Sequence, residues 1–108
     1  MRLSEAKALV QQLEQQHDQA VTDYSAWRTR GNANRCKATY SALQAAERAL
    51  LRATLHAQAV RWADLGHHAE SQELETALQN GTNDLALIVL STRLAAVMSA
   101  GLAGGGVA

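Results

Sequence analysis

The spacing of apolar residues in the first part of this chain is that of a helix packed against a neighbour. From Ser4 to about Arg30 the apolar residues occupy two heptad positions, with Leu3, Val10, His17 and Tyr24 on one and Ala6, Leu13, Ala20 and Trp27 on the other. A seven-residue repeat of this kind is typical of the buried seam between paired helices. Ser4 is a suitable N-cap, so we expect a helix over residues 4–30 with its aromatic residues in the core.

The same spacing continues in a second helix, which we expect over residues 35–65. One heptad position holds Leu43, Leu50 and Ala57, and the other holds Ala46, Ala53 and Val60. A second apolar stripe lies on a different face and consists of Leu51, Leu55 and Trp62. Gly31 is placed to end the first helix in a left-handed C-cap, and Asn32 or Asn34 to cap the second. The two segments therefore predict a long αα-hairpin.

Two shorter helices complete the pattern, over residues 68–79 and 84–100. Gly66 and Gly81 are the expected stops before them, and Thr82 or Asn83 is the expected N-cap of the last helix. That last helix is apolar around most of its circumference, so we expect it to be buried within the chain or in an interface. Residues 101–108 are rich in glycine and are expected to form a tail without intrinsic order.

Composition supports an all-α fold, a small helical bundle led by the hairpin. The chain has 108 residues, no proline, no phenylalanine and only 4% aromatic residues, whereas helix formers fill long stretches. This length predicts one domain, over residues 1–100. The single cysteine, Cys36, excludes an intramolecular disulfide and fits a reducing compartment. No secretory signal is recognisable, so we expect a cytoplasmic protein or one within a larger assembly.

A separation of charge lies within the net charge of zero. Between Ala26 and Arg61 there are seven bases and one acid, Glu47, which gives +6, so the remainder of the chain sums to −6. Four of these bases flank the expected turn at Gly31, and we name them the basic tip: Arg28, Arg30, Arg35 and Lys37. Such a cluster is typical of a docking surface for an acidic partner, or of an internal electrostatic latch.

Residues with catalytic or metal-binding chemistry do not form a recognisable set. His67 and His68 precede Glu70 and Glu73, a spacing that places two ligands on one helical face, but no further histidine or cysteine completes a tetrahedral site. No nucleophile is paired with a base. We therefore expect a non-enzymatic protein without a metal site or a cofactor.

Apolar helix faces combined with a basic tip favour a protein–protein interaction module, an adaptor, assembly subunit or small regulator. Its partner, a second copy or another protein, would contact the basic tip and six apolar residues, Leu51, Leu55, Trp62, Leu87, Leu90 and Leu94. The alternative is a nucleic-acid-binding or transcription-regulating protein that uses the basic tip. A third possibility is a membrane span over residues 85–103, although Arg93 near its middle would cost roughly 3 kcal/mol.

Overall fold

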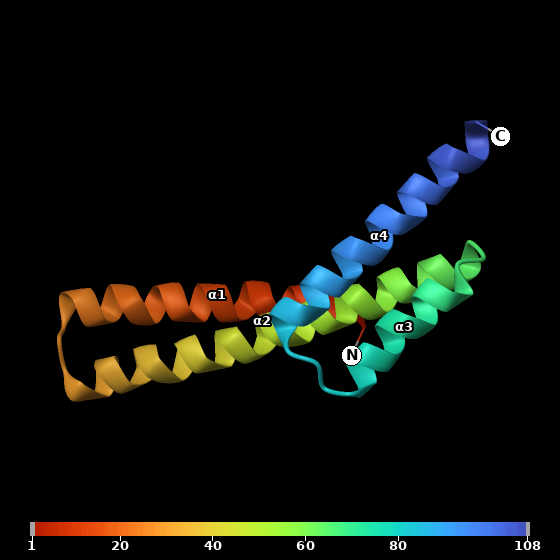
Figure 1. Cartoon of the computed structure of the whole chain (residues 1–108). Coiled ribbons are helices and arrows are strands. Elements are labelled where there is room, and N and C mark those ends of the chain that lie inside the picture. Colours follow the sequence, from red (N-terminus) through yellow and green to blue (C-terminus); the bar gives the residue numbers. More distant parts are fainter. Residues whose placement is uncertain (1, 108) are drawn as a thin grey trace. The chain divides into compact units, whose positions relative to one another are not determined.

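The computed structural model describes the backbone of residues 2–107 and the side chains of residues 2–101. Within residues 2–107 it contains four helices and no strand: α1 (Leu3–Ala26), α2 (Arg30–Asp64), α3 (His68–Gln79) and α4 (Asp84–Val107) (Figure 1). The prediction of an all-α fold led by a long helical hairpin is confirmed. Contacts group the chain into two compact units, Met1–Ala53 and Thr54–Ala108, and each unit is described separately below. The prediction of one domain over residues 1–100 stays a prediction.

The turn of the hairpin lies earlier than Gly31, so the predicted role of this glycine is wrong. Helix α1 ends at Ala26 and α2 already begins at Arg30, which places Gly31 inside α2 without a positive φ. Thr29 replaces the expected asparagine cap, because its hydroxyl accepts the backbone N–H of Asn32 at 3.1 Å. The side-chain amide of Asn32 in turn donates to the carbonyl oxygen of Trp27 at 2.8 Å. Local side-chain hydrogen bonds therefore close this turn instead of a glycine.

Glycine does end the next two helices, as predicted. Gly66 follows α2 with a φ of 91° and Gly81 follows α3 with a φ of 70°, both in the left-handed region. The expected cap of α4 is also confirmed, because the Asn83 side-chain oxygen accepts the backbone N–H of Ala86 at 2.9 Å. Helix α4 begins as expected, at Asp84, whose carboxylate suits the positive end of the helix dipole.

The C-terminal segment differs from the expected tail. Helix α4 does not stop near residue 100 but continues to Val107 through the glycines. Extending an existing helix adds one hydrogen bond for each residue fixed, which offsets part of the low helix propensity of glycine. The side chains after Gly101, and the whole of residue 108, lie outside the described residues.

In the first unit, α1 and the first part of α2 pack along the predicted seam. On α1 the heptad positions from Leu3 to Ala20 are buried or half-buried, and on α2 the same holds for Leu43, Ala46 and Leu50. His17 is half-buried in this seam, where its Nδ1 atom lies 2.9 Å from the hydroxyl oxygen of Thr39. The polar residue at this core position thus has a partner on the facing helix.

In the second unit, the last part of α2 buries a different face, with α3 and α4. Ala57 and Val60 were predicted to continue the first seam, but both are exposed. The buried residues of this unit are Leu55, Ala59, Trp62, Ser71, Leu74, Leu87, Ser91, Leu94 and Met98. The Ser71 hydroxyl donates to the Ala59 carbonyl oxygen at 2.7 Å, which joins α3 to α2. Small residues allow this close approach of the two backbones.

Candidate functional site

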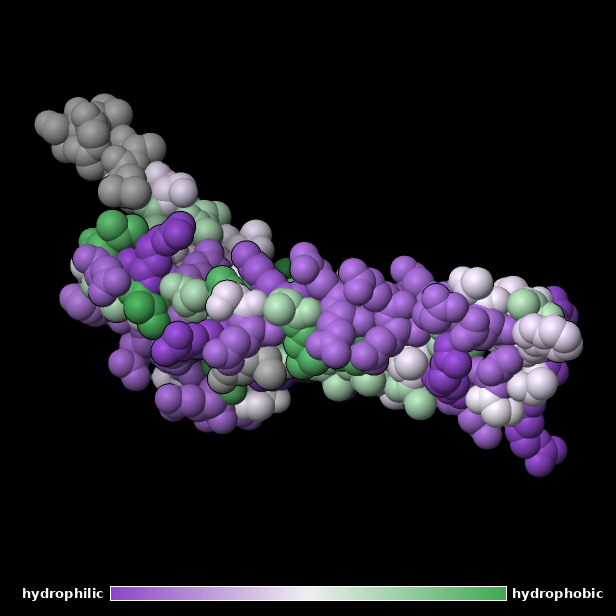
Figure 2. All heavy atoms as spheres, turned by 180° about the vertical axis from the view of Figure 1, so that it is seen from behind, coloured by the Kyte–Doolittle hydropathy of each residue, from purple (hydrophilic) through white to green (hydrophobic). Residues whose placement is uncertain are grey.

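The basic tip surrounds the turn between α1 and α2. Arg28 lies in the turn itself, Arg30 is the first residue of α2, and Lys37 lies two helical turns further along α2; all three side chains are exposed. In the space-filling view, the end of this hairpin shows strongly hydrophilic residues beside residues of intermediate hydropathy (Figure 2). Arg35 is exposed as well, so the structure presents all four predicted bases to solvent around one turn.

Arg35, the fourth base, is engaged within the hairpin. Its guanidinium forms a salt bridge with the carboxylate of Asp23, near the end of α1. The hydrogen bond from Arg35, together with a 2.9 Å hydrogen bond from the Gln19 amide, holds the pKa of Asp23 below its ordinary value of 3.8. Asp23 thus stays ionised at neutral pH and neutralises Arg35. Among the described residues, this is the one salt bridge that involves a base of the tip, so it forms the electrostatic latch that the charge pattern suggested.

Arg28, Arg30 and Lys37 form no salt bridge among the described residues. The sequence contains no acid between Asp23 and Glu47. Of the four bases, one is paired, so three positive charges remain available to an outside anion.

The aromatic residues near the tip are not in the core, and the prediction that they are is wrong. Trp27 is 75% exposed, Tyr40 is 52% exposed and Tyr24 is 37% exposed. The heptad pattern fails at Trp27 because α1 ends at Ala26, so the chain turns away before Trp27 reaches the seam. Tyr24 and Tyr40 lie within α1 and α2, and the end of α1 does not explain their exposure. Tyr40 lies against His17, with the ring centroids 5.7 Å apart. The tip therefore combines exposed aromatic rings with cations.

Most of the six apolar residues predicted to contact a partner are core residues instead. Leu55, Trp62, Leu87 and Leu94 are buried, and Leu51 and Leu90 are half-buried. Side chains enclosed by their own chain have little area left to give to another molecule. Of the six, only Leu51, in the first unit, and Leu90, in the second, keep part of their area for a contact with another molecule.

An exposed apolar surface lies on the side of α4 opposite its buried residues. The buried seam of α4 has 4-3-4 spacing and consists of Leu87, Ser91, Leu94 and Met98. At 100° per residue, Leu85, Val89 and Ala96 lie opposite that seam, flanked by Ile88 and Val97. The exposed side chains of Thr92 and Arg93 lie on the same side of the helix, between these apolar residues. Leu85 is 72% and Val89 59% exposed. We name these five residues the outer face of α4; the apolar composition of the whole helix concealed it from an analysis of periodicity.

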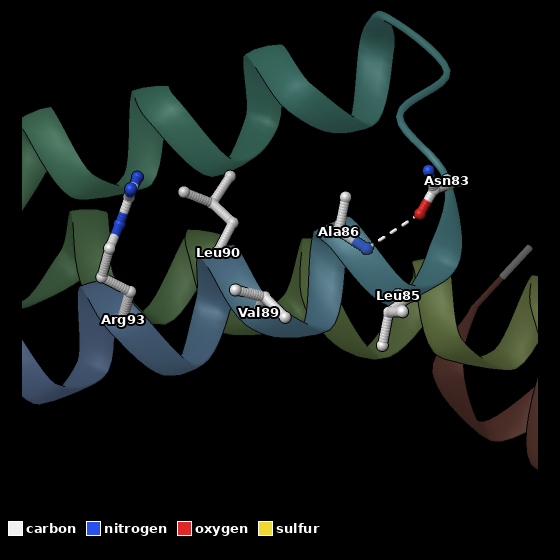
Figure 3. Close-up of a pocket in the computed structure, with 6 residues that line it drawn as sticks. All are labelled: Asn83, Leu85, Ala86, Val89, Leu90 and Arg93. Carbon is white, nitrogen blue, oxygen red and sulfur yellow. Dashed lines mark hydrogen bonds between the residues drawn. The ribbon is translucent and has the colours of Figure 1, made fainter.

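An open groove of about 410 Å³ borders this face, lined by Asn83, Leu85, Ala86, Val89, Leu90 and Arg93. Ala86, Leu90 and Arg93 extend toward α3, whereas Leu85 and Val89 do not (Figure 3). The Arg93 guanidinium lies 3.2 Å from a carboxylate oxygen of Glu73 on α3. The ion pair directs Arg93, the one charged side chain that lines the groove, toward α3, although its side chain stays 64% exposed.

The structure also bears on two other kinds of site, a membrane span and a metal site. Residues 84–101 of α4 are long enough and apolar enough to cross a membrane, with a mean hydropathy of 1.5, by length and composition alone. Among the described residues, no three histidine, cysteine, aspartate or glutamate side chains lie together as a group that would hold a metal ion.

No protein-family model, curated protein or solved structure matches the chain.

Proposed function

We propose that this chain is a non-enzymatic protein–protein interaction module, an adaptor, assembly subunit or small regulator. The observation that carries the proposal is the outer face of α4: large apolar side chains that remain exposed on a helix whose opposite side is already packed. Leu85, Ile88, Val89 and Val97 are between 44% and 72% exposed. Clustered exposed apolar side chains, unlike scattered ones, are typical of interaction sites.

The free energy that the outer face of α4 would contribute to binding depends on the apolar area it exposes. Full burial of a leucine or valine side chain contributes about 1.5–3 kcal/mol, so four side chains exposed by roughly half would contribute about 3–6 kcal/mol from this side alone. A matching face on the partner would contribute a similar amount. Association costs roughly 4–15 kcal/mol, so the outer face supports binding of moderate strength when an apolar helix of a second copy or another protein covers it.

The basic tip supplies the second element of the proposed function. Exposed charges contribute more to the rate and orientation of association than to affinity. Arg28, Arg30 and Lys37 would favour a partner with an acidic surface at that position. Arg35 contributes less, because Asp23 already pairs with it.

The test is the molar mass of the full chain in solution, measured by light scattering over a range of concentrations. We expect a mass above the 11.6 kDa of the monomer for the wild type. The double variant Leu85→Glu/Val89→Glu should shift the protein to a monomer, because association would bury two carboxylates without partners. The matched control Gln11→Glu/Gln15→Glu adds the same charge to exposed positions of α1 and should keep the wild-type mass.

The outcomes separate the possible occupants of the outer face. A wild type that remains monomeric at every concentration would contradict self-association and leave a foreign protein as the only partner. A wild type that needs detergent, while the Leu85→Glu/Val89→Glu variant does not, would contradict a protein partner and indicate a lipid bilayer.

A further inference from the structure

The tip of the hairpin places an exposed indole ring next to three unpaired cations. Trp27 is 75% exposed and directly precedes Arg28, and Arg30 follows within the same turn. Lys37 lies seven residues after Arg30, a spacing that returns to the same face of a helix about 10 Å further along its axis. A tryptophan and a row of cations thus follow one another from the turn onto the first turns of α2.

We propose that this surface, Trp27 with Arg28, Arg30 and Lys37, binds single-stranded nucleic acid. An unpaired base stacks on the indole ring, and the cations contact the phosphates that follow along the strand. This is the usual combination in proteins that bind single strands with little sequence preference: aromatic rings for the bases and positive charge for the backbone. The proposal does not use the outer face of α4, so it is independent of that part of the proposed function. At the tip it assigns Arg28, Arg30 and Lys37 to a nucleic acid instead of an acidic protein, and the competition experiment below decides between the two.

The exposed ring distinguishes a single strand from the other anionic partners. In a double helix the bases are stacked on one another, so a duplex would use the cations and leave the indole in water. Carboxylates of an acidic protein segment would likewise satisfy the cations and give the ring no flat partner. A single strand presents both a planar base for the one indole ring and phosphates for the cations that follow it.

The three cations set the expected dependence on salt. A single strand releases about 0.7 counterions for each phosphate neutralised, so three contacts predict a slope near −2 for log affinity against log salt. Raising the salt concentration from 50 to 200 mM should therefore weaken binding by about 20-fold. A steeper dependence would require additional cations, and Arg35 would not supply one while it is paired with Asp23.

The experiment is fluorescence anisotropy of labelled 12-nucleotide single strands, DNA and RNA, titrated with the full chain at 50 mM salt. Trp27→Ala should weaken binding by about 5- to 150-fold, the range measured for loss of one base–aromatic stack. Trp27→Phe should retain most of the affinity. Arg30→Glu/Lys37→Glu should abolish binding, whereas Arg61→Glu, an exposed arginine near the end of the same helix, should change it little.

Competition experiments decide between the partners, and circular dichroism confirms that each variant remains helical. Unlabelled single strands should displace the probe, whereas a duplex of equal length and a polyglutamate of equal charge should compete weakly. Equal competition by the duplex would overturn the stacking contact, and equal competition by polyglutamate would identify the tip as a site for acidic proteins. Absence of binding at 50 mM salt, or unchanged affinity of Trp27→Ala, would overturn the proposal. Leu85→Glu/Val89→Glu should bind normally, which separates this test from that of the proposed function.

Discussion

Replacing Arg30 by glutamate should make the protein more stable while it weakens the proposed binding of a single strand. Arg30 is the first residue of α2, and the first turn of α2 contains no acid. The N-terminal end of a helix carries about half a positive charge, so a cation at this position is unfavourable and an anion is favourable. The side chain is also exposed, so the substitution removes no packing.

The expected gain in stability has two contributions, from the positive charge removed and the negative charge introduced. Removing an unfavourable positive charge and introducing a favourable negative one each contribute about 0.3–1 kcal/mol, which gives about 0.6–2 kcal/mol for Arg30→Glu. Arg30→Gln should give about half of this gain. Lys37→Glu makes the same change of charge two turns into the helix, where the dipole effect has fallen off, and should alter stability little.

The assay is urea unfolding followed by circular dichroism, with the midpoint concentration compared at equal slopes. The gain of Arg30→Glu should shrink in 1 M sodium chloride, because exposed charges are screened over a few ångströms there. A variant that is no more stable than the wild type, or a gain that salt does not reduce, would refute the argument. Arg30→Glu is expected to raise the stability and to lower the affinity for a single strand. Unfolding of the variant therefore cannot explain the lower affinity.

Three further predictions concern the two units. Leu74→Ala removes a side chain with no exposed area from the core of the second unit and should cost about 2–5 kcal/mol, measured by urea unfolding. Asn83→Ala removes the cap of α4 and should cost about 1 kcal/mol in the same assay, whereas Asn83→Ser should recover most of it. The pKa of the Asp23 carboxyl, measured by nuclear magnetic resonance, should lie below 3.8 and should rise toward that value in Arg35→Gln. Because the pKa of Asp23 is lower in the folded than in the unfolded state, the pair with Arg35 stabilises the protein above about pH 4. This stabilisation is lost as the pH falls further.

The heptad pattern was a reliable guide where both helices of the hairpin continue. It placed Ala6, Val10 and Ala20 in the seam correctly, and all three are buried. It failed at Trp27 because a repeat gives the direction of a side chain only while the helix lasts. The end of α1 is set by hydrogen bonds of Thr29 and Asn32, which a pattern of apolar residues does not contain.

The candidate surfaces were predictable to different degrees. The basic tip was evident in the sequence, because a run of bases without acids keeps its sign in any fold. The salt bridge of Arg35 could not be predicted from the sequence, because it depends on which residue of α1 lies opposite Arg35 in the hairpin. The outer face of α4 was hidden for another reason: when apolar residues surround a helix, periodicity cannot show which side the protein buries.

Alanine explains why the predicted seam of α2 is buried in the first unit but does not continue through Ala57 and Val60 in the second, where the predicted stripe with Leu55 and Trp62 is buried instead. Alanines are frequent along α2 and fit a seam or an exposed position at little cost, so they do not determine which face is buried. The large side chains determine which face of α2 is buried. In the second unit this face contains Leu55 and Trp62. Ala59, between them, is buried too, although it lay on neither predicted heptad position. Ala57, on the predicted seam, is exposed for the same reason. Burial of a tryptophan and a leucine contributes several kcal/mol, far more than burial of alanine methyl groups, so in a helix of this composition the few large residues outweigh a longer run of small ones in regular spacing.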